Sequence, residues 1–182
     1  FYGSRPQFLC SSATIANPKD LAERLTGETV RLIDDNGAPS GEKHFIFYNP
    51  PVVGGDGVRE SVLQAGRRIA GKFVQNGIQT IVFARSRLAT EVLLTYLQED
   101  MAKGARGVTR KRAADIRGYR GGYLPNERRA IERGLRSGDV LGVVSTNALE
   151  LGIDVGRLDA CVMAGYPGTI AATWQQAGRA GR

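Results

Sequence analysis

Residues that commonly bind metal ions are scarce in this sequence, because two of its 182 residues are cysteines and one is a histidine. These are too few for a four-ligand zinc site, and we expect no metal site built by this chain. Cys10 and Cys161 stand far apart, each in an apolar run, which favours small core residues over a disulfide. Unpaired thiols are typical of a reducing compartment, so we expect a cytoplasmic protein.

Long apolar stretches are also missing, since no run approaches the roughly 20 residues that a membrane-spanning helix needs. We therefore expect no membrane partner. Positive charge, in contrast, is in excess: 25 Lys and Arg against 18 Asp and Glu give a net charge of +7. A positive surface favours a polyanion such as nucleic acid, although the charge balance alone does not identify the partner.

Apolar and amphipathic segments alternate along the chain, which is typical of an α/β fold with a parallel sheet covered by helices on both faces. Asn17 and Pro18 favour the start of a helix that Gly27 would end. The polar stretch 38–43 contains a proline and a glycine, and we expect a hinge between two domains there. We expect strands over residues 8–12, 29–33, 44–48, 80–84, 115–119, 140–145 and 159–164, and further helices over residues 59–75, 87–102, 125–136 and 170–177.

One apparent phosphate-binding loop is a coincidence of spacing. Such a loop has the pattern Gly-x-x-x-x-Gly-Lys followed by Ser or Thr, and residues 66–72 match its first seven positions. Phe73, however, stands where a hydroxyl would hold magnesium. The match also falls inside an amphipathic helix, without the strand-to-helix turn whose amides bind phosphate. We therefore expect this chain to lack half of any nucleotide site and to be inactive by itself.

The last residues of the chain carry a paired-arginine pattern. Arg179 and Arg182 are three residues apart, and each follows a glycine. This spacing places both guanidinium groups on one side of a helical turn. Two permanently charged, planar groups suit a triphosphate whose charge spreads during phosphoryl transfer. Taken alone, the pattern favours two solvated arginines on a frayed terminus.

Five segments, in this order and spacing, resemble motifs of superfamily-two helicases. The resemblance covers essentially the whole chain. It implies a RecA-like domain over residues 41–182, ending just after motif VI, preceded over residues 1–40 by the trailing part of a first RecA-like domain and a hinge. The segments are Ser12–Thr14 (motif III), Ile81–Ser86 (motif IV), Gly121–Gly138 (the helix between motifs IV and V), Ser145–Asp154 (motif V) and Trp174–Arg182 (motif VI).

Other segments are similar to the branch of this superfamily that contains the MrfA and Hrq DNA helicases, among them Tyr48–Pro51, Gly122–Pro125 and Gly165–Thr169. This resemblance implies an ATP-dependent DNA helicase or translocase that moves 3′ to 5′ on single-stranded DNA and acts in DNA repair. An RNA helicase of the same superfamily and a non-catalytic nucleic-acid-binding module with this fold are the alternatives.

The resemblance also implies roles for single residues at a nucleotide site. Arg179 and Arg182 would contact ATP as catalytic residues, with Arg182 as the arginine finger. Gly152, Asp154 and Gln175 would complete this chain's part of the ATP site. Asp154 could instead begin a helix or turn, since aspartate is common there. The first RecA-like domain of the same polypeptide would bind most of the ATP and the Mg²⁺ ion.

A second set of residues would contact nucleic acid. Thr146 stands at the motif V position that binds a backbone phosphate, and a hydroxyl at a strand end suits that role. Arg85 and Ser86 end the motif IV strand and could bind the backbone too. Alternatively, they are a polar strand end at which Ser86 caps the next helix. Ser12 and Thr14 would couple the two halves of the motor.

Overall fold

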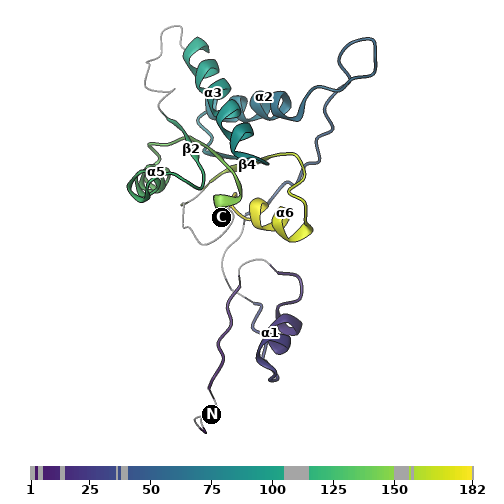
Figure 1. The fold of residues 1–182 in the computed structure, drawn as a ribbon, viewed down its shortest axis with the longest axis vertical. Coiled ribbons are helices and arrows are strands. Elements are labelled where there is room, and N and C mark those ends of the chain that lie inside the picture. The colour runs from purple at the N-terminus through teal and green to yellow at the C-terminus, as the bar shows by residue number, and fades with distance from the viewer. Residues whose placement is uncertain are drawn as a thin grey trace. The chain divides into compact units, whose positions relative to one another are not determined.

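The computed structural model of the chain divides into two compact units, Phe1–Pro39 and Ser40–Arg182 (Figure 1). None of the helices among the described residues is long and apolar enough to cross a membrane. The residues that the structure describes are 3, 6–12, 15–35, 37, 41–104, 115–149, 156 and 158–181.

The first unit contains the helix α1 (Pro18–Thr26), as the sequence predicts. Pro18 occupies the first turn, and Gly27 ends the helix in a left-handed conformation with φ of 72°. The strands expected over 8–12 and 29–33 are wrong, because the described residues of these segments form no ladder. Strand propensity does not provide a hydrogen-bonded neighbour, and the apolar side chains of both segments are largely exposed.

The second unit is built on a four-stranded parallel sheet with the order β2-β3-β1-β4. Pairs such as Val82 with Val144 and Val82 with Val162 place β1 between β3 and β4. This arrangement confirms the predicted parallel α/β sheet. The strands are β1 (Thr80–Ala84), β2 (Ile116–Tyr119), β3 (Gly142–Ser145) and β4 (Ala160–Ala164).

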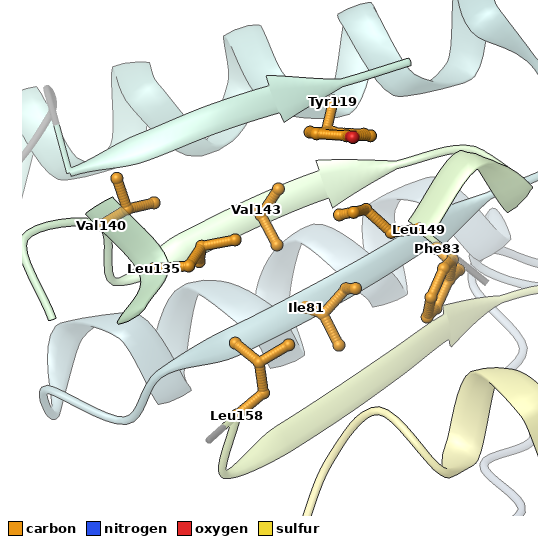
Figure 2. Close-up of a cluster of buried hydrophobic side chains, with 8 residues drawn as sticks. All are labelled: Ile81, Phe83, Tyr119, Leu135, Val140, Val143, Leu149 and Leu158. Atoms are coloured by element: carbon orange, nitrogen blue, oxygen red, sulfur yellow. The ribbon is translucent and has the colours of Figure 1, made fainter. Parts of the chain in front are cut away.

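Helices cover both faces of this sheet, as the alternating sequence pattern predicts. Successive strand residues point to opposite faces, so each strand serves two cores. One core packs Val82 and its neighbours against α2 and α3. The other contains Ile81 and Phe83 together with Leu135 of α5 and Leu149 of η1 (Figure 2). The helices are α2 (Val62–Gln75), α3 (Arg87–Gly104), α5 (Pro125–Ser137), the 3-10 helix η1 (Asn147–Leu149) and α6 (Ile170–Ala177).

The segment before α2 differs from the prediction in two ways. The helix begins after Ser61, whose Oγ accepts a hydrogen bond from the Gln64 amide at 3.2 Å, rather than at Arg59. Arg59 instead pairs with Val52 in an antiparallel bridge. The strand expected over 44–48 is also absent from the described sheet. Local hydrophobicity suggested a strand there, but residues 44–48 pair with no strand of the described sheet, and Ile46 and Phe47 are 79% and 89% exposed.

The glycines of the apparent phosphate loop lie inside α2, and their role is close packing. A Cβ atom at Gly66 would lie 3.5 Å from Cβ of Ala164, and one at Gly71 would lie 3.7 Å from Leu97. Both are ordinary van der Waals distances, so the two glycines pack closely against β4 and α3 but leave room for a methyl group. The location of residues 66–72 within a helix is therefore confirmed.

The two cysteines have different surroundings. Cys10 is exposed, so its prediction as a core residue is wrong. Cys161 lies in β4, where its Sγ donates to the carbonyl of Gln176 at 3.4 Å. Burial raises the pKa of the Cys161 thiol to about 12. Both thiols are free.

Candidate nucleic-acid interface

A pocket lies where β1 and β3 end, and it contains the three residues predicted to contact nucleic acid. The two strands are parallel neighbours with Phe83 paired to Ser145, so the residues that follow them emerge side by side. This is the sheet edge at which α/β folds bind ligands. The pocket has a volume of about 350 Å³ and is lined by Arg85, Ser86, Arg87, Gly121, Thr146, Asn147 and Ala148.

Ser86 caps α3, which is the alternative role that its position in the sequence allowed. Its Oγ accepts a hydrogen bond from the Ala89 amide at 3.1 Å, and its carbonyl accepts one from the Thr90 amide at 3.0 Å. The hydroxyl keeps a proton that it can donate toward the pocket. Capping also directs the positive end of an 18-residue helix toward this sheet edge.

Thr146 connects β3 to η1 at the opposite side of the pocket. The Ser145 hydroxyl donates to the carbonyl of Thr146 at 2.8 Å, which fixes this peptide. Oγ1 of Thr146 accepts a hydrogen bond from the Ala148 amide at 3.4 Å. The threonine is half-buried, so its side chain is held by its neighbours but accessible from the pocket.

Two exposed arginines supply the charge of the pocket. A Cβ atom at Gly165 would lie 3.2 Å from Cδ of Arg85, so the Arg85 side chain passes over this glycine. A Cβ atom at Gly121 would lie 3.9 Å from Nη2 of Arg87. The described residues that line the pocket include no Asp or Glu. The arginines, together with the start of α3, therefore make the pocket suitable for an anion.

Two of the residues predicted for the nucleotide site are described by the structure, Gln175 in α6 and Arg179 just after it. Gln175 and Arg179 are both half-buried. The amide of Gly181 donates to the carbonyl of Leu158 at 2.8 Å, and Ala180 forms a parallel bridge with Leu158. The backbone around Arg179 is thus anchored beside the start of β4 and not frayed.

Other predicted residues cannot be placed in this site. Gly152, Asp154 and Arg182 lie outside the described residues, as does Thr14. Ser12 is exposed and belongs to the first unit. Across the parts of the chain that the structure describes, no group of three or more His, Cys, Asp or Glu side chains could hold a metal ion.

The sequence matches a known family over most of its length. The helicase conserved C-terminal domain matches residues 61–182, which include the whole sheet and the pocket. The chain belongs to this family. The prediction of a superfamily-two helicase domain is confirmed.

Proteins similar to this helicase domain are much longer. The uncharacterized ATP-dependent helicase YprA of Bacillus subtilis is 61% identical over 183 residues, covering 100% of this chain and 24% of YprA. The ATP-dependent helicase hrq1 of Schizosaccharomyces pombe is 36% identical, covering 100% of this chain and 17% of its own length. The crystal structure of the DUF1998 helicase MrfA bound to DNA and AMPPNP has a TM-score of 0.88 and 61% identity, with 100% of this chain and 24% of that chain covered. This helicase domain spans about a quarter or less of these relatives.

Sequence reasoning missed four residues that line the pocket of this helicase domain: Arg87, Gly121, Asn147 and Ala148. Arg87 and Asn147 directly follow predicted site residues after β1 and β3, and Ala148 comes next after Asn147. Gly121 follows β2, which is the neighbour of β3 on its other side. The rule that ligands bind at the carboxyl ends of parallel strands could have found all four, had the strand order been known.

Proposed function

We propose that this chain is the second motor domain of an ATP-dependent helicase or translocase, and that it binds the backbone of single-stranded DNA in the pocket. The observation that supports this most directly is the convergence of Arg85, Ser86 and Thr146 on one pocket without an acidic residue among its described lining. Guanidinium and hydroxyl groups are typical phosphate ligands, and they carry no information about base sequence.

We assign the contact with ATP to the residues at the C-terminal end of the sequence. Arg179 and Arg182 would contact ATP across a cleft, with Arg182 as the arginine finger, and Gln175, Gly152 and Asp154 beside them. The anchored backbone at Gly181 supports this role, because a charged group must be held in place to act on a transition state. ATP with Mg²⁺ would be held mainly by the first RecA-like domain, of which residues 1–40 would be the trailing part.

The proposal of DNA as the partner rests on relatives. The MrfA structure, which is 61% identical, contains DNA and AMPPNP. Movement from 3′ to 5′ and a role in DNA repair come from the resemblance to the MrfA and Hrq branch. An RNA helicase is the second candidate, because hydroxyl and arginine contacts with phosphates do not distinguish the two sugars.

A salt titration of nucleic-acid binding tests the pocket. In the full-length protein, the Kd of labelled oligo-dT should rise steeply with salt and vary little with base sequence. Arg85→Ala should weaken binding and reduce the slope of log Kd against log salt by about 0.7. Arg129→Ala, a loss of charge on the exposed side of α5, is the control and should leave the Kd unchanged. Equal affinity for oligo-rU would favour the RNA candidate. A Kd that does not change in Arg85→Ala would refute the proposal that the pocket binds nucleic acid.

Coupling to ATP hydrolysis tests whether the domain is part of a motor. Thr146→Ala should lower DNA-stimulated turnover while unstimulated turnover and the melting temperature stay unchanged. Thr95→Ala is a matched control, since the Thr95 hydroxyl is exposed and donates only to its own helix, to the Glu91 carbonyl at 2.9 Å. A protein that binds DNA but never hydrolyses ATP would favour the non-catalytic module.

A further inference from the structure

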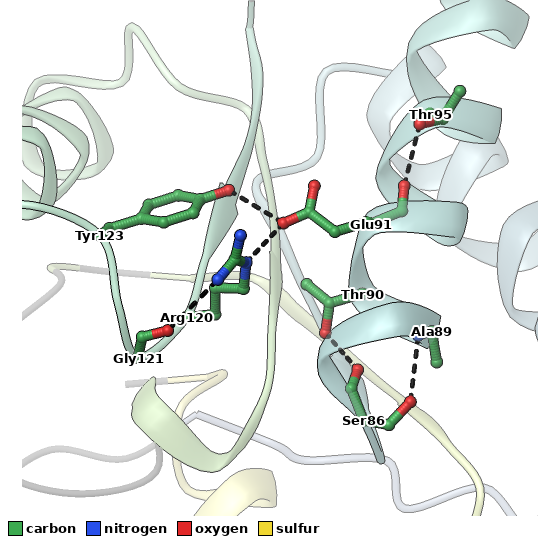
Figure 3. A network of polar contacts seen from close by, with 8 residues as sticks. All are labelled: Ser86, Ala89, Thr90, Glu91, Thr95, Arg120, Gly121 and Tyr123. Carbon is green, nitrogen blue, oxygen red and sulfur yellow. Dashed lines mark hydrogen bonds and ion pairs between the residues drawn. The ribbon is translucent and has the colours of Figure 1, made fainter.

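A polar network joins α3 to the turn that follows β2, next to the pocket (Figure 3). Nε of Arg120 donates to Oε1 of Glu91 at 2.6 Å, and the Tyr123 hydroxyl donates to the same oxygen at 3.4 Å. The Arg120 guanidinium also lies over the Tyr123 ring, 5.0 Å from its centroid. One carboxylate of α3 therefore holds two side chains of the turn.

The turn held by this network forms a wall of the pocket. Gly121 lies between the two tethered residues and lines the pocket. Nη1 of Arg120 donates to the Gly121 carbonyl at 3.4 Å, and the Tyr123 amide donates to the Arg120 carbonyl at 3.4 Å. Gly122 has a φ of 101°, a conformation that glycine adopts without strain. The network thus determines where the Gly121 backbone stands relative to α3.

The partner that Glu91 contacts also determines the charge at the pocket. Arg87 lies one helical turn before Glu91, at a spacing where arginine and glutamate commonly pair. Among the described residues, the ion pair of Glu91 is made with Arg120, while Arg87 lines the pocket beside Gly121. The hydrogen bond with Glu91 raises the pKa of Arg120 above its ordinary value.

We propose that Glu91 and Arg120 are positioning residues whose ion pair sets the width of the pocket that a nucleic-acid phosphate enters. This inference rests on the proposed function, because it takes nucleic acid as the ligand. The side chains of Arg120 and Glu91 are 30% and 42% exposed, and ion pairs this accessible contribute little to folding stability. Their contribution is to binding affinity: they hold the Gly121 turn in place before the phosphate binds, so no free energy is lost in ordering the turn on binding.

Glu91→Gln in the full-length protein is the test, because an electrostatic role and a positioning role of Glu91 predict changes of Kd in opposite directions. The substitution removes a negative charge near the pocket, so electrostatic attraction alone would tighten the binding of nucleic acid. If the ion pair positions the wall, binding weakens, because a neutral amide holds Arg120 less firmly. We expect the Kd of labelled oligo-dT to rise about tenfold at constant salt, which corresponds to about 1.4 kcal/mol of binding free energy. An unchanged or lowered Kd would overturn the proposal.

The matched control is Asp100→Asn, which also removes one negative charge from α3. Nε of Arg67 donates to Oδ2 of Asp100 at 2.6 Å, and this pair joins α2 to α3 without lining the pocket. Its side chains are 24% and 29% exposed, similar to those of the pair under test. We expect no rise in Kd for this variant. An equal rise in both variants would show a general effect on α3 and overturn the positioning role.

Salt dependence separates positioning from direct phosphate contact. If Arg120 only positions the wall, Arg120→Ala and Glu91→Gln should raise the Kd similarly, and the double variant should show no further loss. Arg120→Lys should rescue binding only in part, since lysine cannot contact Glu91 and the Gly121 carbonyl as a planar group. A fall of about 0.7 in the salt slope for Arg120→Ala alone would mean that Arg120 itself contacts phosphate, and would overturn the proposal.

Variants of the pocket itself separate failure of this inference from failure of the proposed function. Arg85→Ala and Thr146→Ala are measured in the same assay, with the melting temperature of every variant. If they weaken binding while Glu91→Gln does not, only the positioning role is wrong. If they too leave the Kd unchanged in folded protein, the pocket does not bind nucleic acid and both proposals fail.

Discussion

The side chain of Arg85 passes over Gly165, so that a Cβ atom on Gly165 would lie 3.2 Å from Cδ of Arg85. Arg85 follows β1 and Gly165 follows the neighbouring strand β4, whose Ala164 pairs with Ala84. The absence of a side chain at Gly165 therefore allows Arg85 its path to the pocket. Gly165 also has a φ of 99°, where other residues are strained.

Gly165→Ala should weaken nucleic-acid binding because the new methyl group displaces Arg85. The backbone strain should also lower the free energy of unfolding by about 1–3 kcal/mol. Gly168→Ala is the control, since Gly168 has a φ of 103° but nothing within 4 Å of its added Cβ. Denaturant unfolding should show similar losses for both variants, whereas anisotropy should show a raised Kd only for Gly165→Ala. A raised Kd in both would mean that strain, and not the contact with Arg85, is responsible.

Arg182→Ala should reduce DNA-stimulated ATP turnover in the full-length protein by about 10³-fold, if Arg182 is the arginine finger. Arg182→Lys should restore only part of the rate, because lysine lacks the planar group. Turnover, nucleotide binding and the melting temperature are measured together. Arg129→Ala, on the exposed side of α5, should change stability by less than about 0.5 kcal/mol and leave turnover unchanged. A folded Arg182→Ala protein with parental turnover would contradict the assignment.

The two thiols should differ in reactivity. Burial raises the pKa of Cys161 to about 12 from an ordinary value of 9.0, so the folded protein contains almost no Cys161 thiolate at pH 8. A thiol reagent added to the 182-residue chain should therefore modify the exposed Cys10 quickly and Cys161 only after denaturant is added. The folded state holds the Cys161 proton more tightly than the unfolded state does. The protonated thiol therefore makes its full contribution to the free energy of unfolding below pH 9, and this contribution is lost as the pH rises toward 12. Cys10→Ala identifies the fast thiol, and equal rates for both would refute the prediction.

Gly66→Ala should be tolerated or stabilising, by up to about 1 kcal/mol, because alanine is favoured over glycine within a helix. The added methyl group meets Cβ of Ala164 at an ordinary contact distance of 3.5 Å. Thermal unfolding and ATP turnover of the full-length protein provide the measurement. A loss of turnover with retained stability would mean that residues 66–72 bind phosphate after all.

The core of the sheet could be predicted because its strands are short apolar runs between turn signals. The strand Thr80–Ala84 has the bounds that the sequence predicts, and so does the helix Ile170–Ala177. Residues 44–48 have a similar apolar pattern but form no strand, because pairing depends on a neighbour that a sequence does not specify. Hydrophobicity thus predicted the buried strands correctly, but it also predicted strands in apolar segments that have no neighbouring strand to pair with.

Those residues of the candidate site could be predicted that directly follow a single apolar strand. Arg85 and Thr146 are polar residues that directly follow apolar runs, which made them candidates from the sequence. Glu91 and Arg120 carry no such signal, because their relation depends on how α3 lies against β2. The convergence of Gly121 with the other lining residues likewise depends on the strand order β2-β3-β1.

The central position of β1 has a mechanical consequence. Hydrogen bonds join β1 to β3, which leads to Thr146, and to β4, which leads to α6 and Arg179. Shear between these strands would break backbone hydrogen bonds on one side or the other. We therefore expect the strand ends that form the pocket and the strand that leads to α6 to move together as one rigid unit when the domain is displaced.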